Sequence, residues 1–236
     1  MMKIYFVGAG PGDPGLITVK GMELLKKADV LVYAGSLVNP SLVEASSAGV
    51  KLDSHGMSLE SLVDTMVSGA RDGRLVVRLH SGDPSLYGAV VEQIAELKKA
   101  GIEVEIVPGV SSMFAAAAAL QTQLTLKGVS ETVVVTRPAG ATLGEDRIRE
   151  LSRHGATMVI FLGTEKLEDV MKKVEYPPGT PVAVVYHASW PDQKVVKGTV
   201  SDISGKVREA GIERTALIII GGVVGAEGYG RSLLYS

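Results

Sequence analysis

The sequence contains no cysteine and only four histidines among its 236 residues. The lack of cysteine excludes disulfides, thiolate catalysis and any zinc or iron–sulfur site built on cysteine ligands. The histidines, at positions 55, 80, 154 and 187, lie far apart along the chain, and no pair has the spacing of a zinc protease. Nothing in the sequence therefore argues for a metal site.

An excess of charge of one sign is also missing. The formal net charge is −2 and neither half of the chain is basic, which argues against a nucleic-acid-binding protein. The N-terminus enters an apolar strand pattern without the charged lead and long apolar core of a signal peptide. The apolar run at 216–224 is interrupted by two glycines and is too short to cross a bilayer. We therefore expect a cytoplasmic protein.

What the chain does contain is two successive alternations of short apolar runs with helical patterns. Hydrophobic residues make up 46% of the sequence, enough for a real core in one large domain or two smaller ones. The aperiodic stretch 121–131 is the candidate linker. The sequence thus predicts an α/β fold of two domains, 1–120 and 121–236, with a cleft between them. Strands are expected at 3–7, 30–33, 51–52, 76–79, 104–107, 132–136, 157–162, 182–186, 194–199 and 216–220.

Residues 76–87 (VVRLHSGDPSLY) are the most informative stretch. A buried strand ends at residues 81–84, and Leu86 then begins a helical pattern. An open α/β fold places its ligand where such a strand ends. Gly82 is expected to admit close approach of another group, and Asp83 to supply a carboxylate. The alternative is that Asp83 only caps the following helix.

The first strand opens into the glycine-rich segment 8–15 (GAGPGDPG), which invites comparison with dinucleotide-binding loops. Gly8 and Gly10 fit the G-x-G-x-x-G pattern, but Asp13 occupies its sixth position and prolines remove two amide donors. The next strand also ends without an acidic residue to hold a ribose. Binding of NAD or FAD is therefore disfavoured.

A third loop, 107–112 (VPGVSS), precedes an alanine-rich helical segment. Its two serines either cap that helix or line a pocket, and both roles can coexist. In their order and spacing the three loops resemble those of the tetrapyrrole methylases, S-adenosylmethionine enzymes of cobalamin and sirohaem synthesis. Residues 33–38 (YAGSLV) are most similar to the branch that methylates C11 of precorrin-4 or cobalt-precorrin-4.

This resemblance implies the tetrapyrrole methylase fold of class III methyltransferases, a homodimer, and S-adenosylmethionine bound in the interdomain cleft. The implied tetrapyrrole substrate is precorrin-4 or cobalt-precorrin-4, methylated during cobalamin (vitamin B12) biosynthesis. The protein is not expected to bind nucleic acid or a membrane. The cofactor-binding residues implied by the resemblance are Pro11, Ser81, Gly82, Asp83, Leu86, Ser111, Ser112, Leu162, Ala188 and Ala216.

Methyl transfer from a sulfonium requires alignment more than acid–base groups, which suits a chain without cysteine and with few histidines. The sequence does not single out a catalytic base; the candidates are His80, Tyr33 and His187. Basic groups are expected near the carboxylates of the acceptor. Possible contacts are Arg78, Arg137, Lys127 and His55, although for each one an ordinary surface charge is the simpler interpretation.

Four alternatives stay open. The first is another tetrapyrrole methylase, acting on precorrin-2, precorrin-3 or uroporphyrinogen III. The second is diphthine synthase, which modifies a protein histidine. The third is a nicotinamide-dependent reductase that uses the first glycine loop. The fourth is a tetrapyrrole carrier without catalytic activity.

Overall fold

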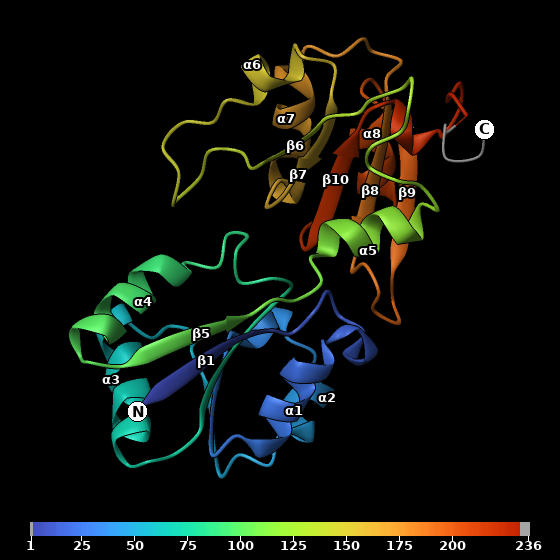
Figure 1. Ribbon diagram of the computed structural model, residues 1–236. Helices are drawn as coiled ribbons and strands as arrows, with labels where there is room; N and C mark the ends of the chain where they lie inside the picture. Colours follow the sequence, from blue (N-terminus) through green and yellow to red (C-terminus); the bar gives the residue numbers. More distant parts are fainter. Residues whose placement is uncertain (1, 232–236) are drawn as a thin grey trace. The chain divides into compact units, whose positions relative to one another are not determined.

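The computed structural model describes residues 2–231 of the chain. Contacts divide the chain into two compact units, Met1–Ser112 and Met113–Ser236, and each unit contains one five-stranded sheet. This confirms the prediction of two sheets in a mixed α/β fold (Figure 1). The segment 121–131 packs inside the second unit, where Leu124 belongs to the core. The domain division after residue 120 stays a prediction.

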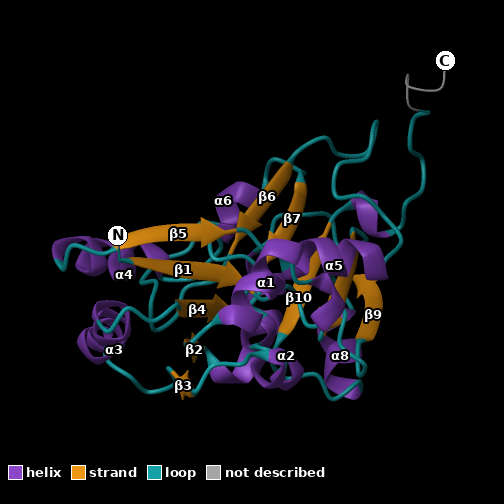
Figure 2. Ribbon diagram, turned by 60° about the horizontal axis from the view of Figure 1, so that its bottom comes forward, coloured by secondary structure: helices purple, strands orange, loops and turns teal. Residues whose placement is uncertain are grey.

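The sheet of the first unit is parallel throughout and has the strand order β3-β2-β4-β1-β5. The arrows of β1, β4 and β5 point the same way in Figure 2, so the carboxyl ends of these three strands reach the same edge. The strands are β1 (Lys3–Gly8), β2 (Val30–Tyr33), β3 (Val50–Asp53), β4 (Val76–His80) and β5 (Glu103–Val107). The α-helices are α1 (Val19–Lys27), α2 (Pro40–Ala45), α3 (Leu59–Arg71) and α4 (Val90–Lys99), with 3₁₀ turns η1 (Pro14–Leu16) and η2 (Gly35–Leu37).

Helices cover both faces of this sheet because successive residues of a buried strand point to opposite sides. Leu25 of α1 and Leu42 of α2 pack with Val77 and Leu79 on one face. On the other face, α3 and α4 pack against the strand residues that point to the opposite side, such as Val76. Both faces of β4 are therefore buried, as its apolar pattern predicts.

The helix after β4 begins later than predicted. It starts at Val90 rather than Leu86, and residues 84–87 form turns. Tyr87 (φ 55°) and Ala89 (φ 49°) both adopt the left-handed region, which a continuous helix cannot contain. Ala89 is the N-cap and supplies no side-chain hydrogen bond, so Asp83 does not cap α4. By contrast, the predicted cap of α1 is confirmed, since the Thr18 side chain accepts a hydrogen bond from Gly21 N at 3.1 Å.

The sheet of the second unit is mixed, with the order β6-β7-β10-β8-β9. Strand β10 runs antiparallel to both of its neighbours, and among the described residues of this second sheet only β6 and β7 pair in parallel. The strands are β6 (Val133–Thr136), β7 (Thr157–Ile160), β8 (Pro181–Tyr186), β9 (Lys194–Thr199) and β10 (Ala216–Ile220). The helices are α5 (Ser112–Ala119), α6 (Ile148–Ser152), α7 (Leu167–Lys173) and α8 (Ile203–Glu209), with η3 (Thr164–Lys166) and η4 (Gly222–Val224).

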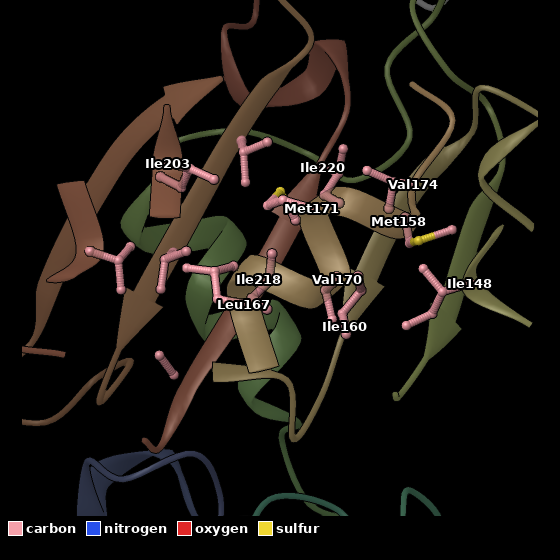
Figure 3. Close-up of a cluster of buried hydrophobic side chains, with 14 of the residues drawn as sticks. Ile148, Met158, Ile160, Leu167, Val170, Met171, Val174, Ile203, Ile218 and Ile220 are labelled. Carbon is pink, nitrogen blue, oxygen red and sulfur yellow. The ribbon is translucent and has the colours of Figure 1, made fainter. Parts of the chain in front are cut away.

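Two apolar clusters hold this second sheet between its helices. Figure 3 shows the first, in which Ile160 and Ile218 of neighbouring strands meet Leu167 and Val170 of α7. The second lies on the opposite face, where the alanine-rich helix α5 packs on Val159, Val185 and other residues of the strands. Within residues 2–231 no helix has the length and apolar character needed to cross a membrane.

Candidate functional site

Three loops meet at the carboxyl edge of the first sheet, where β1, β4 and β5 end. The loops after β1 and β4 are joined by two hydrogen bonds between Gly10 and Gly82, at 3.2 Å and 2.8 Å. Ala9 N also donates to the carbonyl oxygen of His80 at 2.7 Å. The first two motifs of the sequence therefore form one bonded unit.

The loop after β5 joins this unit through contacts that only glycine permits. A Cβ built on Gly109 would lie 2.2 Å from the carbonyl oxygen of Gly82 and 2.7 Å from the Cα of Gly8. A Cβ on Gly8 would lie 2.5 Å from the Cα of Gly109. A real Cβ does not come this close to backbone atoms. The three loops can therefore pack at this distance only because both positions are glycine. The sequence contains both glycines in its motifs, but no local signal marks them as neighbours.

The backbone of Gly82 gives one reason for glycine at this position. A Cβ there would make ordinary contacts, at 3.8 Å from Ser111 Cα and 3.9 Å from Ser112 N. Its φ of 60° lies in the left-handed region, which disfavours other residues. Backbone conformation therefore favours glycine at this position, and the expected close approach of a ligand stays a prediction.

Asp83 fastens the loop after β4 to the loop after β5. One carboxylate oxygen accepts from Gly109 N at 2.8 Å, and the other accepts from Ser85 N at 2.8 Å and from the Ser85 hydroxyl. Partial burial acts to raise the pKa of Asp83, but these hydrogen bonds from Ser85 and Gly109 outweigh it and lower the pKa. The side chain is thus a carboxylate near neutral pH, with most of its acceptor capacity already used.

The predicted site residues of the first unit come together around these loops. Ser81, Gly82 and Asp83 are half-buried, and Leu86 lies in the following turn with its N–H bonded to the Asp83 carbonyl at 3.2 Å. Pro11 follows Gly10 in the chain, and the backbones of Ser111 and Ser112 lie beside Gly82 in space.

The predicted residues of the second unit meet at one end of its own sheet. Ala216 opens β10 opposite Tyr186, and Ala188 follows β8 in the next turn; both alanines are buried. Leu162 follows β7 and is 64% exposed, with a φ of 54° that is unfavourable for leucine. The hydroxyl of Thr164 ties this end together, because it bonds both the carbonyl oxygen (3.0 Å) and the N–H (3.2 Å) of Ala216.

His187, beside Ala188, is held in one orientation. Its Nδ1 lies 3.0 Å from both carboxylate oxygens of Asp192, and its ring stacks on Tyr186 with the centroids 3.8 Å apart. The Trp190 ring lies 5.3 Å away on a tilt. A carboxylate at Nδ1 favours the tautomer with its proton there, which leaves Nε2 the basic nitrogen.

The candidate base His80 has a very different environment. It is 5% exposed, stacks on Phe6, and its Nε2 has no hydrogen-bond partner among the described residues. Burial, and secondarily the positive charge of Arg78, lower its pKa to about 3. His80 is therefore neutral at physiological pH and a poor proton acceptor there.

The edge formed by the three loops has a definite electrostatic character. Residues 8–15, 81–85 and 107–112 contain no lysine or arginine, whereas they contain the carboxylates of Asp13 and Asp83. Such an edge favours a cationic ligand over a phosphate-rich dinucleotide, which needs amide donors and positive charge. Glycine backbone and serine hydroxyls supply the hydrogen-bonding groups. The arrangement is suited to binding a polar, positively charged small molecule.

Comparison with known proteins agrees with this geometry. The sequence profile of the Tetrapyrrole (Corrin/Porphyrin) Methylases matches residues 3–204. A relative from Methanocaldococcus jannaschii, the cobalt-precorrin-4 C(11)-methyltransferase, is 52% identical, with 99% of this chain and 92% of the relative covered.

Two solved structures extend the comparison. The crystal structure of a cobalt-precorrin-4 methyltransferase superposes with a TM-score of 0.91 at 45% identity, covering 94% of this chain and 96% of the other. The uroporphyrin-III C-methyl transferase of Thermus thermophilus, complexed with S-adenosylhomocysteine, superposes at 0.81 with 29% identity, covering 95% and 99%. With a profile match over most of its length and relatives of this identity, the chain belongs to the tetrapyrrole methylase family.

Proposed function

We propose that this enzyme transfers a methyl group from S-adenosylmethionine to C11 of precorrin-4 or cobalt-precorrin-4 during cobalamin biosynthesis. The observation that carries the proposal is the 52% identity, over 99% of the chain, to a protein named for that reaction. The YAGSLV segment at 33–38, which resembles the same branch, supports it.

The glycine-lined edge of the first unit fits a donor that carries a positive sulfur. Its three loops offer carboxylate, hydroxyl and backbone groups and no basic side chain. We assign donor binding in this unit to Pro11, Ser81, Gly82, Asp83, Leu86, Ser111 and Ser112. In the second unit, we assign donor binding to Leu162, Ala188 and Ala216. When bound, S-adenosylmethionine supplies a methyl group activated by the positive sulfur.

The protein's part in such a reaction is chiefly positioning. In-line displacement needs the donor carbon and the acceptor carbon about 3 to 3.5 Å apart and aligned. The hydrogen bonds of Gly10 with Gly82, and of Gly109 with Asp83, hold the loops in a fixed shape for that purpose. Among the candidate bases, the ordered His187 is better suited than the neutral, buried His80 to accept the proton released after methylation.

The family resemblance further supports a homodimer that acts in the cytoplasm. Light scattering coupled to size-exclusion chromatography measures the first property, and a mass of twice 24.7 kDa is the expected result. A monomeric mass for the active enzyme would contradict it.

The decisive experiment offers the purified enzyme methyl-labelled S-adenosylmethionine with precorrin-4, cobalt-precorrin-4 and uroporphyrinogen III in parallel. We expect label at C11 of one or both precorrin-4 forms, located by NMR, and over many turnovers. Label on uroporphyrinogen III alone would instead make the chain a uroporphyrinogen methylase. Stoichiometric binding without turnover would favour a carrier.

A further inference from the structure

The first unit buries a positive charge without a matching negative one. Arg78 lies in β4 on the face covered by α3 and α4, and only 5% of it is exposed. Its Nε donates to Gln93 Oε1 at 3.4 Å, but its Nη1 is buried with no hydrogen-bond partner within residues 2–231. Burying an uncompensated guanidinium is costly, so such a group indicates that an anion joins it at some stage.

Among residues 2–231, Asp53 is the carboxylate whose charge acts on Arg78, and its hydrogen bonds go to other groups. Asp53 raises the pKa of Arg78, yet burial dominates and lowers it to about 10. The Asp53 carboxylate accepts hydrogen bonds from Gly35 N and His55 N, both at 2.9 Å. Asp53 therefore acts on Arg78 through its charge and makes no ion pair or hydrogen bond with the guanidinium among the described residues.

A second unpartnered group lies on the same face of the same strand. His80 is two residues beyond Arg78, so both side chains point to the same side of the sheet. Its Nε2 is buried without a partner among the described residues. As a neutral imidazole it can donate through Nε2, so that the two side chains together offer an anion a guanidinium and an N–H.

The first turn of α4 completes the surroundings. Gln93 connects it to Arg78, because Gln93 Nε2 donates to the Ala89 carbonyl at 3.0 Å while Oε1 accepts from Arg78. The N-cap Ala89 provides no side-chain acceptor, so the first N–H groups of this ten-residue helix have no side-chain cap, and the acidic residue of that turn, Glu92, is exposed. Two large hydrophobic side chains at the start of this helix are exposed, Tyr87 at 44% and Val91 at 83%.

We propose that Arg78 and His80, with the first turn of α4, bind one carboxylate of the tetrapyrrole acceptor. The inference rests on the proposed function, which makes that acceptor a polycarboxylate. The apolar surface of Tyr87 and Val91 would then contact the macrocycle. Because His80 leads directly into residues 81–83, this contact sets the acceptor beside the loops assigned to the donor.

The test compares Arg78→Met with Arg74→Met, which removes the same charge from an exposed position just before β4. KM and kcat for the precorrin-4 acceptor, the Kd of S-adenosylhomocysteine and the thermal midpoint are measured for each. We expect Arg78→Met to raise the acceptor KM by about 10- to 100-fold, the range of a hydrogen bond to a charged group. The Kd of S-adenosylhomocysteine should stay within about twofold, and Arg74→Met should resemble the wild type.

A second pair guards against misfolding of Arg78→Met. His80→Leu removes the donor, whereas His80→Gln keeps an amide N–H near the position of Nε2. We expect the leucine variant to raise the acceptor KM and the glutamine variant to restore most of the affinity. An unchanged KM in folded Arg78→Met or His80→Leu would overturn the inference and assign the buried groups to internal water.

Equilibrium binding of uroporphyrin III, a stable octacarboxylate, provides a readout that needs no turnover. Wild-type and Arg74→Met protein should bind it more tightly than Arg78→Met, as measured by porphyrin fluorescence. If the wild type methylates no acceptor but this difference holds, the proposed function fails while the carboxylate site stands. If all forms bind equally well, or none binds, the carboxylate site is overturned.

Discussion

The carboxylate of Asp83 accepts a hydrogen bond from the backbone N–H of Gly109 over 2.8 Å, across a separation of 26 residues. This bond connects two strand ends that flank β1 in the sheet. Together with the contact between Gly8 and Gly109, it gives the three glycine loops one shape. The loops are thereby organised before any ligand arrives, which is how a site lowers the cost of ordering on binding.

Replacement of Asp83 tests this bond directly. Asp83→Ala leaves Gly109 N without its acceptor, and we expect the free energy of unfolding to fall by about 1–3 kcal/mol. The affinity for S-adenosylhomocysteine should fall as well, since the loops lose their fixed arrangement. Urea unfolding and calorimetric titration measure the two effects. Asp72→Ala, an exposed acid before β4, is the control, and equal behaviour of both variants would refute the role of Asp83.

The close packing of the loops predicts an unusually severe effect of one methyl group. In Gly109→Ala the new Cβ would meet backbone at 2.2 Å and 2.7 Å, so the loops must separate. We expect a loss of stability of about 1–3 kcal/mol, as for overpacked cores, with loss of donor binding. Gly49→Ala, where a Cβ meets nothing within 4 Å, should leave both properties unchanged. Donor binding retained by Gly109→Ala would contradict the arrangement.

Burial of neutral His80 predicts that acid destabilises the first unit. The unfolded histidine takes up a proton near pH 6.5, but the folded one does so only at about pH 3. Between these values the unfolded state binds more protons, so stability is complete above pH 6.5 and declines as pH falls toward 3. At about 1.4 kcal/mol per pKa unit, the loss can reach about 5 kcal/mol.

Urea unfolding at pH 7 and pH 4.5 measures this dependence. We expect His80→Gln to lose clearly less stability between the two pH values than the wild type does. The exposed His154 provides the control, because His154→Gln should retain the wild-type dependence. Identical pH profiles for His80→Gln and the wild type would show that the burial of His80 does not govern acid stability.

The exposed Leu162 should separate stability from ligand binding. Its φ of 54° costs leucine about 1–2 kcal/mol, so Leu162→Gly is expected to maintain or increase stability. If the side chain contacts the donor, the same change weakens the binding of S-adenosylhomocysteine. Thr215→Gly relieves a similar backbone angle (φ 60°) in the same unit and should not affect affinity. Unchanged affinity in Leu162→Gly would remove Leu162 from the donor site.

Much of the architecture was accessible from local patterns. Apolar runs bounded by glycine and proline predict the positions of the strands, and Thr18 predicts the start of α1. The apolar spacing predicts the start of the helix after β4 four residues too early, at Leu86 instead of Val90. Its apolar spacing continues through residues 86–89, where the backbone angles of Tyr87 and Ala89 prevent a helix. The periodicity of apolar residues predicts which residues are buried, but it does not predict a left-handed backbone at a non-glycine residue.

Local patterns along the chain sufficed to predict the strands, the three glycine loops and, through family resemblance, the class of reaction. The folded structure was needed to show that Asp83 bonds Gly109, that Gly8 packs against Gly109, and that Arg78 is a buried charge rather than a surface one. The physical reason is that propensity and periodicity act over a few residues. Contacts between strand ends, and the desolvation of a side chain, depend on residues brought together from distant parts of the chain.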